Sequence, residues 1–109
     1  MEGLELASFQ IISAVGTARA DYIEAIRTAR NGEFEKAKQL VEEGREAYKE
    51  GHEVHFKLIQ EEADGKSAQY SMLMTHAEDQ LMSAEAFGIL AEEFIETYKM
   101  IYSKSDDKE

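Results

Sequence analysis

The chain has 109 residues, of which 43% are hydrophobic and 32% charged, and its formal net charge at pH 7 is −11. This length predicts one domain, and the composition is that of a globular protein. The acidic excess argues against binding to nucleic acid or to an anionic membrane surface, because both need clustered Lys and Arg. There is no cysteine, so disulfides, thiolate catalysis and zinc–thiolate sites are excluded.

Long helices without a membrane span are predicted. No apolar run approaches the length of a membrane span, and the first ten residues, MEGLELASFQ, do not resemble a signal peptide. We therefore expect a cytoplasmic protein. The chain also has no proline, which permits long uninterrupted helices.

Two turn signals, Asn31-Gly32 and Asp64-Gly65, divide the chain into three helical segments. The segments cover about residues 4–30, 33–63 and 67–102. Because short turns between long helices make neighbours antiparallel, the fold class is all-α, an up-down-up three-helix bundle. Residues 1–103 are expected to form this single domain, and residues 104–109 a frayed polar tail.

The first two segments each carry one apolar stripe with a spacing of three and four residues, which is typical of helices that pack at a shallow angle. In the second stripe, Gly44 and Gly51 weaken the helix, so we expect neighbouring helices to approach closely there. The stripe positions are Leu4, Ala7, Ile11, Val15, Ala18, Tyr22, Ala25 and Ala29, then Phe34, Ala37, Val41, Gly44, Tyr48, Gly51, His55 and Leu58.

The third segment is much less charged than the other two. It has no Lys or Arg between Lys66 and Lys99, and within residues 70–90 the acids are Glu78, Asp79 and Glu85. Its apolar residues cover more than one face, as in helices that are buried nearly all round. A three-helix monomer leaves one side of each helix exposed. The extra apolar face therefore predicts that this segment lies at the centre of an oligomer.

His52 and His55, in the string HEVHF, are three residues apart, whereas the zinc-protease motif needs two histidines four apart. The chain contains no Glu-x-x-His pair, so a ferritin-like di-iron site is not supported. We interpret His55 as a packing residue on the second stripe, with His52 beside it.

His76 and Asp79 are three residues apart and so share a helix face, whereas Glu78 points elsewhere. A lone histidine on an apolar helix is more often a packed core or interface residue than a functional one. A carboxylate on such a helix must be protonated, paired or neutralised. On an oligomer axis, copies of Asp79 would meet, and Mg²⁺ would relieve their repulsion. The alternatives are a protonated acid or a cross-helix partner such as Arg45 or Lys49.

The string LMTHAEDQLMSAEAFGILAEEFIETYK resembles the phosphorylation segment of the lactose/cellobiose-type IIA component of the bacterial sugar phosphotransferase system. That family's pattern is close to His-Ala-Gln-Asp-His-Leu-Met. The strings QIISAVGTARADYIEAIRTARNGEFEKAKQLVEEG and LIQEEADGKS resemble its first two helices and its second turn. Glu78 stands where the family usually has Gln, and Gln80 where it usually has His. Glu78 would repel an incoming phosphoryl group unless its side chain turns away.

The resemblance implies a homotrimeric phosphoryl carrier. His76 matches the phosphorylated histidine, and Asp79 matches the acid that binds one Mg²⁺ per trimer at the subunit axis. The histidine-containing phosphocarrier protein would donate the group, and a IIB component would receive it on a cysteine. The membrane permease would phosphorylate the sugar, which is lactose, cellobiose or chitobiose. The alternative functions are a non-catalytic helical-bundle adaptor and a metal-binding trimer.

Overall fold

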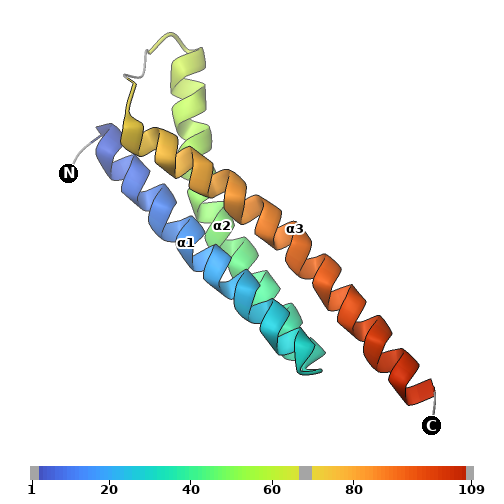
Figure 1. Cartoon of the computed structure of the whole chain (residues 1–109). Coiled ribbons are helices and arrows are strands. Elements are labelled where there is room, and N and C mark those ends of the chain that lie inside the picture. Colours follow the sequence, from blue (N-terminus) through green and yellow to red (C-terminus); the bar gives the residue numbers. More distant parts are fainter. Residues whose placement is uncertain (1–2, 67–69, 108–109) are drawn as a thin grey trace.

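The computed structural model describes residues 3–66 and 70–107, and over these residues the protein is all-α. Helices α1 (Gly3–Arg30), α2 (Phe34–Ala63) and α3 (Met72–Asp107) are each antiparallel to the preceding helix, as Figure 1 shows. The bundle is elongated, with extents of 64 × 23 × 19 Å, and the N- and C-terminal ends lie at opposite ends of it. The predicted fold class is confirmed for the subunit, and the trimer stays a prediction.

The boundaries of α1 and α2 agree with the predicted ones to within one residue, whereas those of α3 differ. The predicted start, Ser67, lies outside the described residues, as do residues 68 and 69. Tyr70 and Ser71, which were predicted to be helical, precede the helix. The hydroxyl oxygen of Ser71 accepts a hydrogen bond from the Met74 backbone N–H at 3.2 Å, which is an N-cap. The polar segment predicted as a frayed tail is helical as far as Asp107, because no Gly or Pro interrupts it.

The turn between α1 and α2 is also where α3 is anchored. Gly32 has a φ of 85°, a left-handed conformation that favours glycine. The Tyr102 ring lies over this glycine, and its hydroxyl donates a hydrogen bond to the Arg30 carbonyl oxygen at 2.9 Å. The Phe34 ring packs edge-on against the same tyrosine, at 5.5 Å between centroids. These contacts hold α3 against the bundle at a point where the sequence predicted the helix to end.

The core consists largely of small side chains, which bring the helices close together. A Cβ atom added at Gly44 would lie only 2.6 Å from Cε1 of Tyr22, and one added at Gly51 would lie 2.9 Å from Cγ1 of Val15. The expected close approach at these two glycines is therefore confirmed. Most of the predicted α1 stripe is buried, namely Ala7, Ile11, Val15, Ala18, Tyr22, Ala25 and Ala29.

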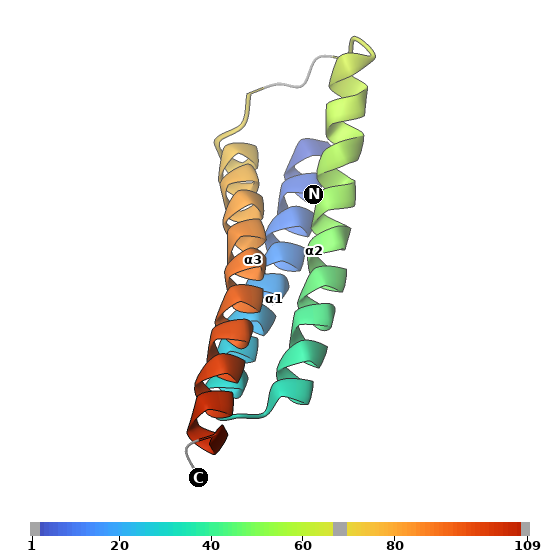
Figure 2. The ribbon, with the colours of Figure 1, turned by 90° about the vertical axis from the view of Figure 1, so that its right-hand side faces the viewer.

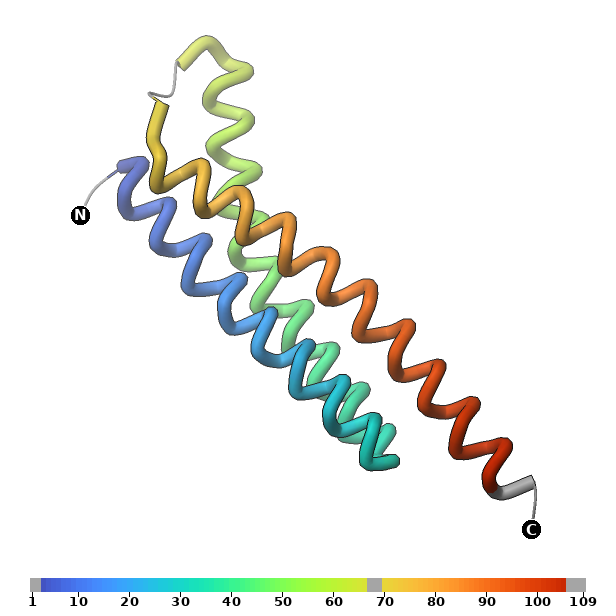
Figure 3. Tube along the Cα trace, in the orientation of Figure 1, coloured from blue at the N-terminus to red at the C-terminus, as the bar shows by residue number. Residues whose placement is uncertain are grey.

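Helix α1 packs along both other helices, whereas α2 and α3 share much less contact. The C-terminal turns of α2 extend away from the other two helices, as Figure 2 and the trace in Figure 3 show. Residues 59–63 are all exposed. Within the part of the chain that the structure describes, no helix is both long and apolar enough to cross a membrane.

Candidate functional site

His76 and Asp79 lie near the start of α3, on the side of the helix that faces away from the core. Both side chains are exposed, whereas Ala77 and Leu81 point into the bundle and are buried. Within residues 3–66 and 70–107, no hydrogen bond or ion pair engages either the His76 imidazole or the Asp79 carboxylate. The imidazole is therefore open to a reactant from solution.

Arg45, the first alternative partner considered for Asp79, instead forms an ion pair with Glu92. This alternative was wrong, because Arg45 projects from α2 toward the side of α3 that carries Glu92 and not toward the side that carries Asp79. Lys49, the second alternative, forms no ion pair with Asp79. Asp79 is left on an open face of α3 in a single chain.

That open face of α3 is strongly apolar, and we call it the outer stripe. Its members are large hydrophobic side chains that are 49–77% exposed in the single chain. Met72 lies seven residues before Asp79 and Met82 three residues after it, which are helical spacings, so the carboxylate lies among these side chains. The outer stripe consists of Met72, Met82, Ile89, Leu90, Met100 and Ile101.

The Glu78 side chain turns away from His76, which is the condition under which it would not repel an incoming phosphoryl group. Its Oε2 atom lies 2.7 Å from Nε2 of His55 on α2, a hydrogen bond and, with a protonated imidazole, an ion pair. Residues two apart on an α-helix project about 200° apart. The Glu78 charge is therefore directed toward α2, and His76 faces the other way.

The two histidines of α2 have packing roles, as interpreted from the sequence. His55 has a side chain that is 18% exposed and binds Glu78, and the ring of His52 stacks on Phe56 with centroids 6.4 Å apart. No three potential metal ligands from His, Asp and Glu gather within the described residues of one chain.

Gln80 faces α1, where it binds an arginine that the sequence analysis did not single out. Nη1 of Arg19 donates a hydrogen bond to Oε1 of Gln80 at 2.9 Å, and its guanidinium carbon lies 5.9 Å from the centroid of the Phe87 ring. Arg19 directly follows the buried Ala18 on the first stripe. Its place in the sequence shows that Arg19 flanks the buried face of α1, but its contact with Gln80 depends on how α3 packs beside α1.

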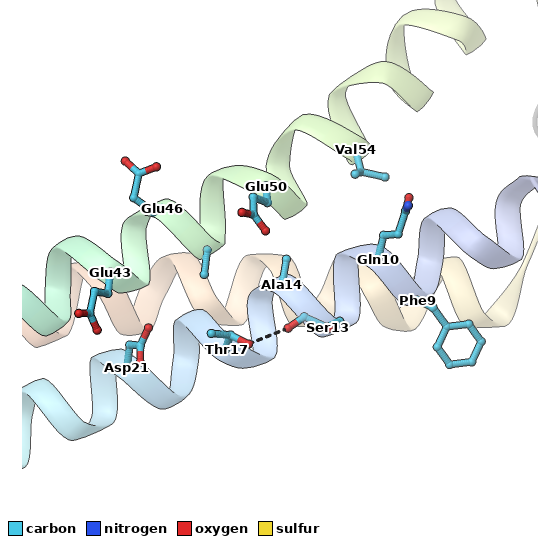
Figure 4. Close-up of a pocket in the computed structure, with 11 residues that line it drawn as sticks. Phe9, Gln10, Ser13, Ala14, Thr17, Asp21, Glu43, Glu46, Glu50 and Val54 are labelled. Atoms are coloured by element: carbon cyan, nitrogen blue, oxygen red, sulfur yellow. Dashed lines mark hydrogen bonds between the residues drawn. The ribbon is translucent and has the colours of Figure 1, made fainter.

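An open groove between α1 and α2 lies apart from these residues (Figure 4). Carboxylates line it, and Asp21 of α1 faces Glu43 of α2 across it. Partial burial, with a smaller contribution from Glu43, raises the pKa of Asp21. Neither His76 nor Asp79 lines this groove, and its charge would repel a phosphoryl group.

Comparison with known proteins agrees with the resemblance in the histidine segment. The family model described as "PTS system, Lactose/Cellobiose specific IIA subunit" matches residues 6–99. A lactose-specific EIIA component of the phosphotransferase system from Staphylococcus epidermidis is 38% identical over 96 residues, covering 88% of this chain and 92% of that protein. The lichenan-specific phosphotransferase enzyme IIA component of Bacillus subtilis is 37% identical over 100 residues, covering 92% and 91%.

Solved structures agree over nearly the whole length. The crystal structure of the cellobiose-specific enzyme IIA from Bacillus anthracis superposes with a TM-score of 0.92 at 38% identity and covers 95% of each chain. A chain from the solution structures of a IIA(chitobiose)–HPr complex superposes with a TM-score of 0.82 at 29% identity, covering 94% of this chain and 99% of that one. The chain therefore belongs to the lactose/cellobiose-specific IIA family of the phosphotransferase system.

Proposed function

We propose that this chain is a cytoplasmic phosphoryl carrier that accepts a phosphoryl group on His76 from the histidine-containing phosphocarrier protein. The observation that carries the proposal is the open imidazole of His76 on α3, at the position of the family's phosphorylated histidine. The structural neighbour solved in complex with HPr, a histidine-containing phosphocarrier protein, supports the choice of donor. The acceptor would be a cysteine of a cognate IIB component, in the uptake of a disaccharide.

The chemistry needs only a nucleophile and good positioning. A neutral imidazole has a lone pair near physiological pH and attacks phosphorus without a separate base. A nitrogen–phosphorus bond to His76 forms as the donor's nitrogen–phosphorus bond breaks, and the electron pair returns to the donor imidazole. In the onward step the thiolate of the IIB cysteine forms a sulfur–phosphorus bond as the bond to His76 breaks, and the electron pair returns to the His76 imidazole. The in-line transition state depends mainly on alignment and charge stabilisation.

We propose further that three copies pack their outer stripes against one another, with α3 innermost. The support is the set of large apolar side chains exposed on one side of α3, because monomeric proteins rarely leave so much apolar surface together in water. On that face, near its His76 end, each subunit offers the carboxylate of Asp79. Three carboxylates about an axis, completed by water, suit Mg²⁺, which would neutralise their mutual repulsion. The metal's role would be structural, and no step of the transfer passes through it.

The carrier role is tested by incubating the protein with phosphoenolpyruvate, enzyme I and the phosphocarrier protein. Intact-mass analysis should show one added phosphoryl group on the wild type and none on His76→Ala. His52→Ala is the matched control and should still be labelled, because His52 contacts neither His76 nor Glu78. Circular dichroism checks that every variant is folded. Labelling of the His76→Ala protein would refute the assignment, and an unlabelled wild type would leave the adaptor and the metal-binding trimer as the functions to test.

A further inference from the structure

Arg19 keeps its positive charge without a carboxylate partner among the described residues. Its two contacts are neutral, namely the side-chain oxygen of Gln80 at 2.9 Å and the ring of Phe87. Every ion pair of the described structure involves other residues. The chain has 23 Asp and Glu against 12 Lys and Arg, yet none of these acids pairs with Arg19 among the described residues. Because the half-buried arginine contacts only neutral groups, its charge is available to an anion.

The guanidinium is held on the side of α3 that carries His76. Gln80 follows His76 by four residues, so their side chains lie on the same side of the helix and about 6 Å apart along its axis. Helix α3 has no cation of its own here, because residues 67–98 contain no Lys or Arg.

Two of the basic residues that reach α3 from α2 are already engaged. Arg45 pairs with Glu92, and His55 binds Glu78 on the side of α3 that faces α2. Lys49 of α2 lines a pocket with Leu81, Met82 and Glu85. Arg19, in contrast, is fixed by a hydrogen bond to Gln80, four residues after His76, and is therefore the cation that a contact holds on the His76 side of α3.

We propose that Arg19 binds the phosphoryl group carried by His76, and that Gln80 is the positioning residue that holds its guanidinium beside α3. This inference rests on the proposed carrier function. A phosphoryl group brings up to two negative charges to a protein whose net charge is −11, next to the carboxylate of Asp79. Without a local cation, phosphorylation would be opposed by electrostatic repulsion.

The geometry of a guanidinium suits this role. It has five N–H donors in a rigid fork that matches phosphate oxygens, and the hydrogen bond to Gln80 uses only one of them. During transfer, negative charge is spread over the three equatorial oxygens of the phosphoryl group, where fixed donors stabilise it. Arg19 donates hydrogen bonds only. It gives up no proton, and the bonds that form and break are those of the carrier reaction.

The test compares Arg19→Gln and Arg19→Lys with the wild type. Arg27→Gln is the matched control, because Arg27 lies on the same helix, is exposed and pairs with its neighbour Glu24. Single-turnover experiments with the phosphorylated form of the histidine-containing phosphocarrier protein as donor give the rate at which His76 is phosphorylated. Titration of phosphohistidine by ³¹P NMR gives the pKa of the phosphoryl group itself, which a purely structural role of Arg19 would not change.

We expect Arg19→Gln to slow phosphorylation by about 10- to 100-fold and to raise the phosphoryl pKa by about one unit. Arg19→Lys should restore part of both effects, and Arg27→Gln should match the wild type. If Arg19→Gln does not fold, the Gln80→Leu variant replaces it. Gln80→Leu removes the hydrogen bond that holds the guanidinium and leaves the charges of Arg19 and Asp79 unchanged. Equal rates and equal phosphoryl pKa values in the Arg19→Gln (or Gln80→Leu) and Arg27→Gln proteins would overturn the inference while His76 is still labelled. An unlabelled wild type would instead overturn the carrier function, and this inference with it.

Discussion

Replacing Gly44 with alanine tests how closely the three helices approach around Tyr22. A Cβ atom at Gly44 would lie 2.6 Å from Cε1 and 2.9 Å from Cδ1 of the Tyr22 ring. Carbon atoms in favourable contact are about 3.5–4.0 Å apart, so the ring would have to move by about 1 Å. The ring has little room to move, because a Cβ at Gly88 on α3 would lie 2.9 Å from its Cζ atom.

Two effects of the Gly44→Ala substitution oppose each other. Alanine favours the helix over glycine by about 0.5–1 kcal/mol, whereas overpacking a tight core costs about 1–3 kcal/mol. Gly16→Ala is the matched control, because Gly16 lies within α1 and a Cβ there has no neighbour within 4 Å. Since both substitutions share the helical preference, the difference between them isolates the steric cost. We expect Gly44→Ala to be less stable than Gly16→Ala by about 1–3 kcal/mol.

Urea unfolding monitored by circular dichroism measures the difference in the free energy of unfolding. All proteins are compared at one concentration, because assembly makes apparent stability depend on it, and sedimentation checks that the variants assemble like the wild type. In a Tyr22→Leu background the penalty of Gly44→Ala should shrink, since the smaller side chain removes the clash. If Gly44→Ala stabilises the protein as much as Gly16→Ala does, the close approach of α2 to Tyr22 is refuted.

The remaining predictions concern two carboxylates. Asp79→Leu should remain a trimer in sedimentation equilibrium and should lose the sensitivity to EDTA in thermal melts, because the apolar side chain replaces a buried charge that needs a metal. Equal EDTA shifts in the wild type and Asp79→Leu, or a monomeric Asp79→Leu protein, would contradict the axial site. Asp21→Asn should raise the free energy of unfolding slightly at pH 7 and have no effect near pH 3. Burial raises the Asp21 pKa above its usual value of 3.8, so the folded protein holds this proton more tightly than the unfolded chain does, and ionisation of Asp21 lowers stability only at pH values above 3.8. If Asp21→Asn still stabilises the protein at pH 3, the ionisation of Asp21 is not the cause.

Local patterns predicted most of the fold because the chain is regular over long stretches. The stripe through Ile11, Ala18 and Ala25 specified one buried face, and Asn31-Gly32 specified a turn. The end of α3 was mispredicted because its polar composition suggested fraying. Tyr102, which holds α3 to the first turn, acts through a contact with a residue 72 positions away.

The site was predictable in part for the same reason. His76 and Asp79 stand out as polar residues in an apolar segment, and their spacing places them on one face. The contacts of Glu78 with His55 and of Gln80 with Arg19 join different helices, and no local pattern carries such information. They became visible only when the rotation of α3 relative to α1 and α2 was known.

The central position of α1 between two helices that touch each other little has a consequence for the order of folding. Ala29 and Ala37, which share a core cluster, are eight residues apart, whereas Arg19 and Gln80 are separated by 61. Closing the longer loop costs roughly 2 kcal/mol more in chain entropy. We therefore expect the hairpin of α1 and α2 to form first and α3 to dock last. The surroundings of His76 would then be completed only in the final step, and a chain still emerging from the ribosome would have its α1–α2 hairpin before it has a working site.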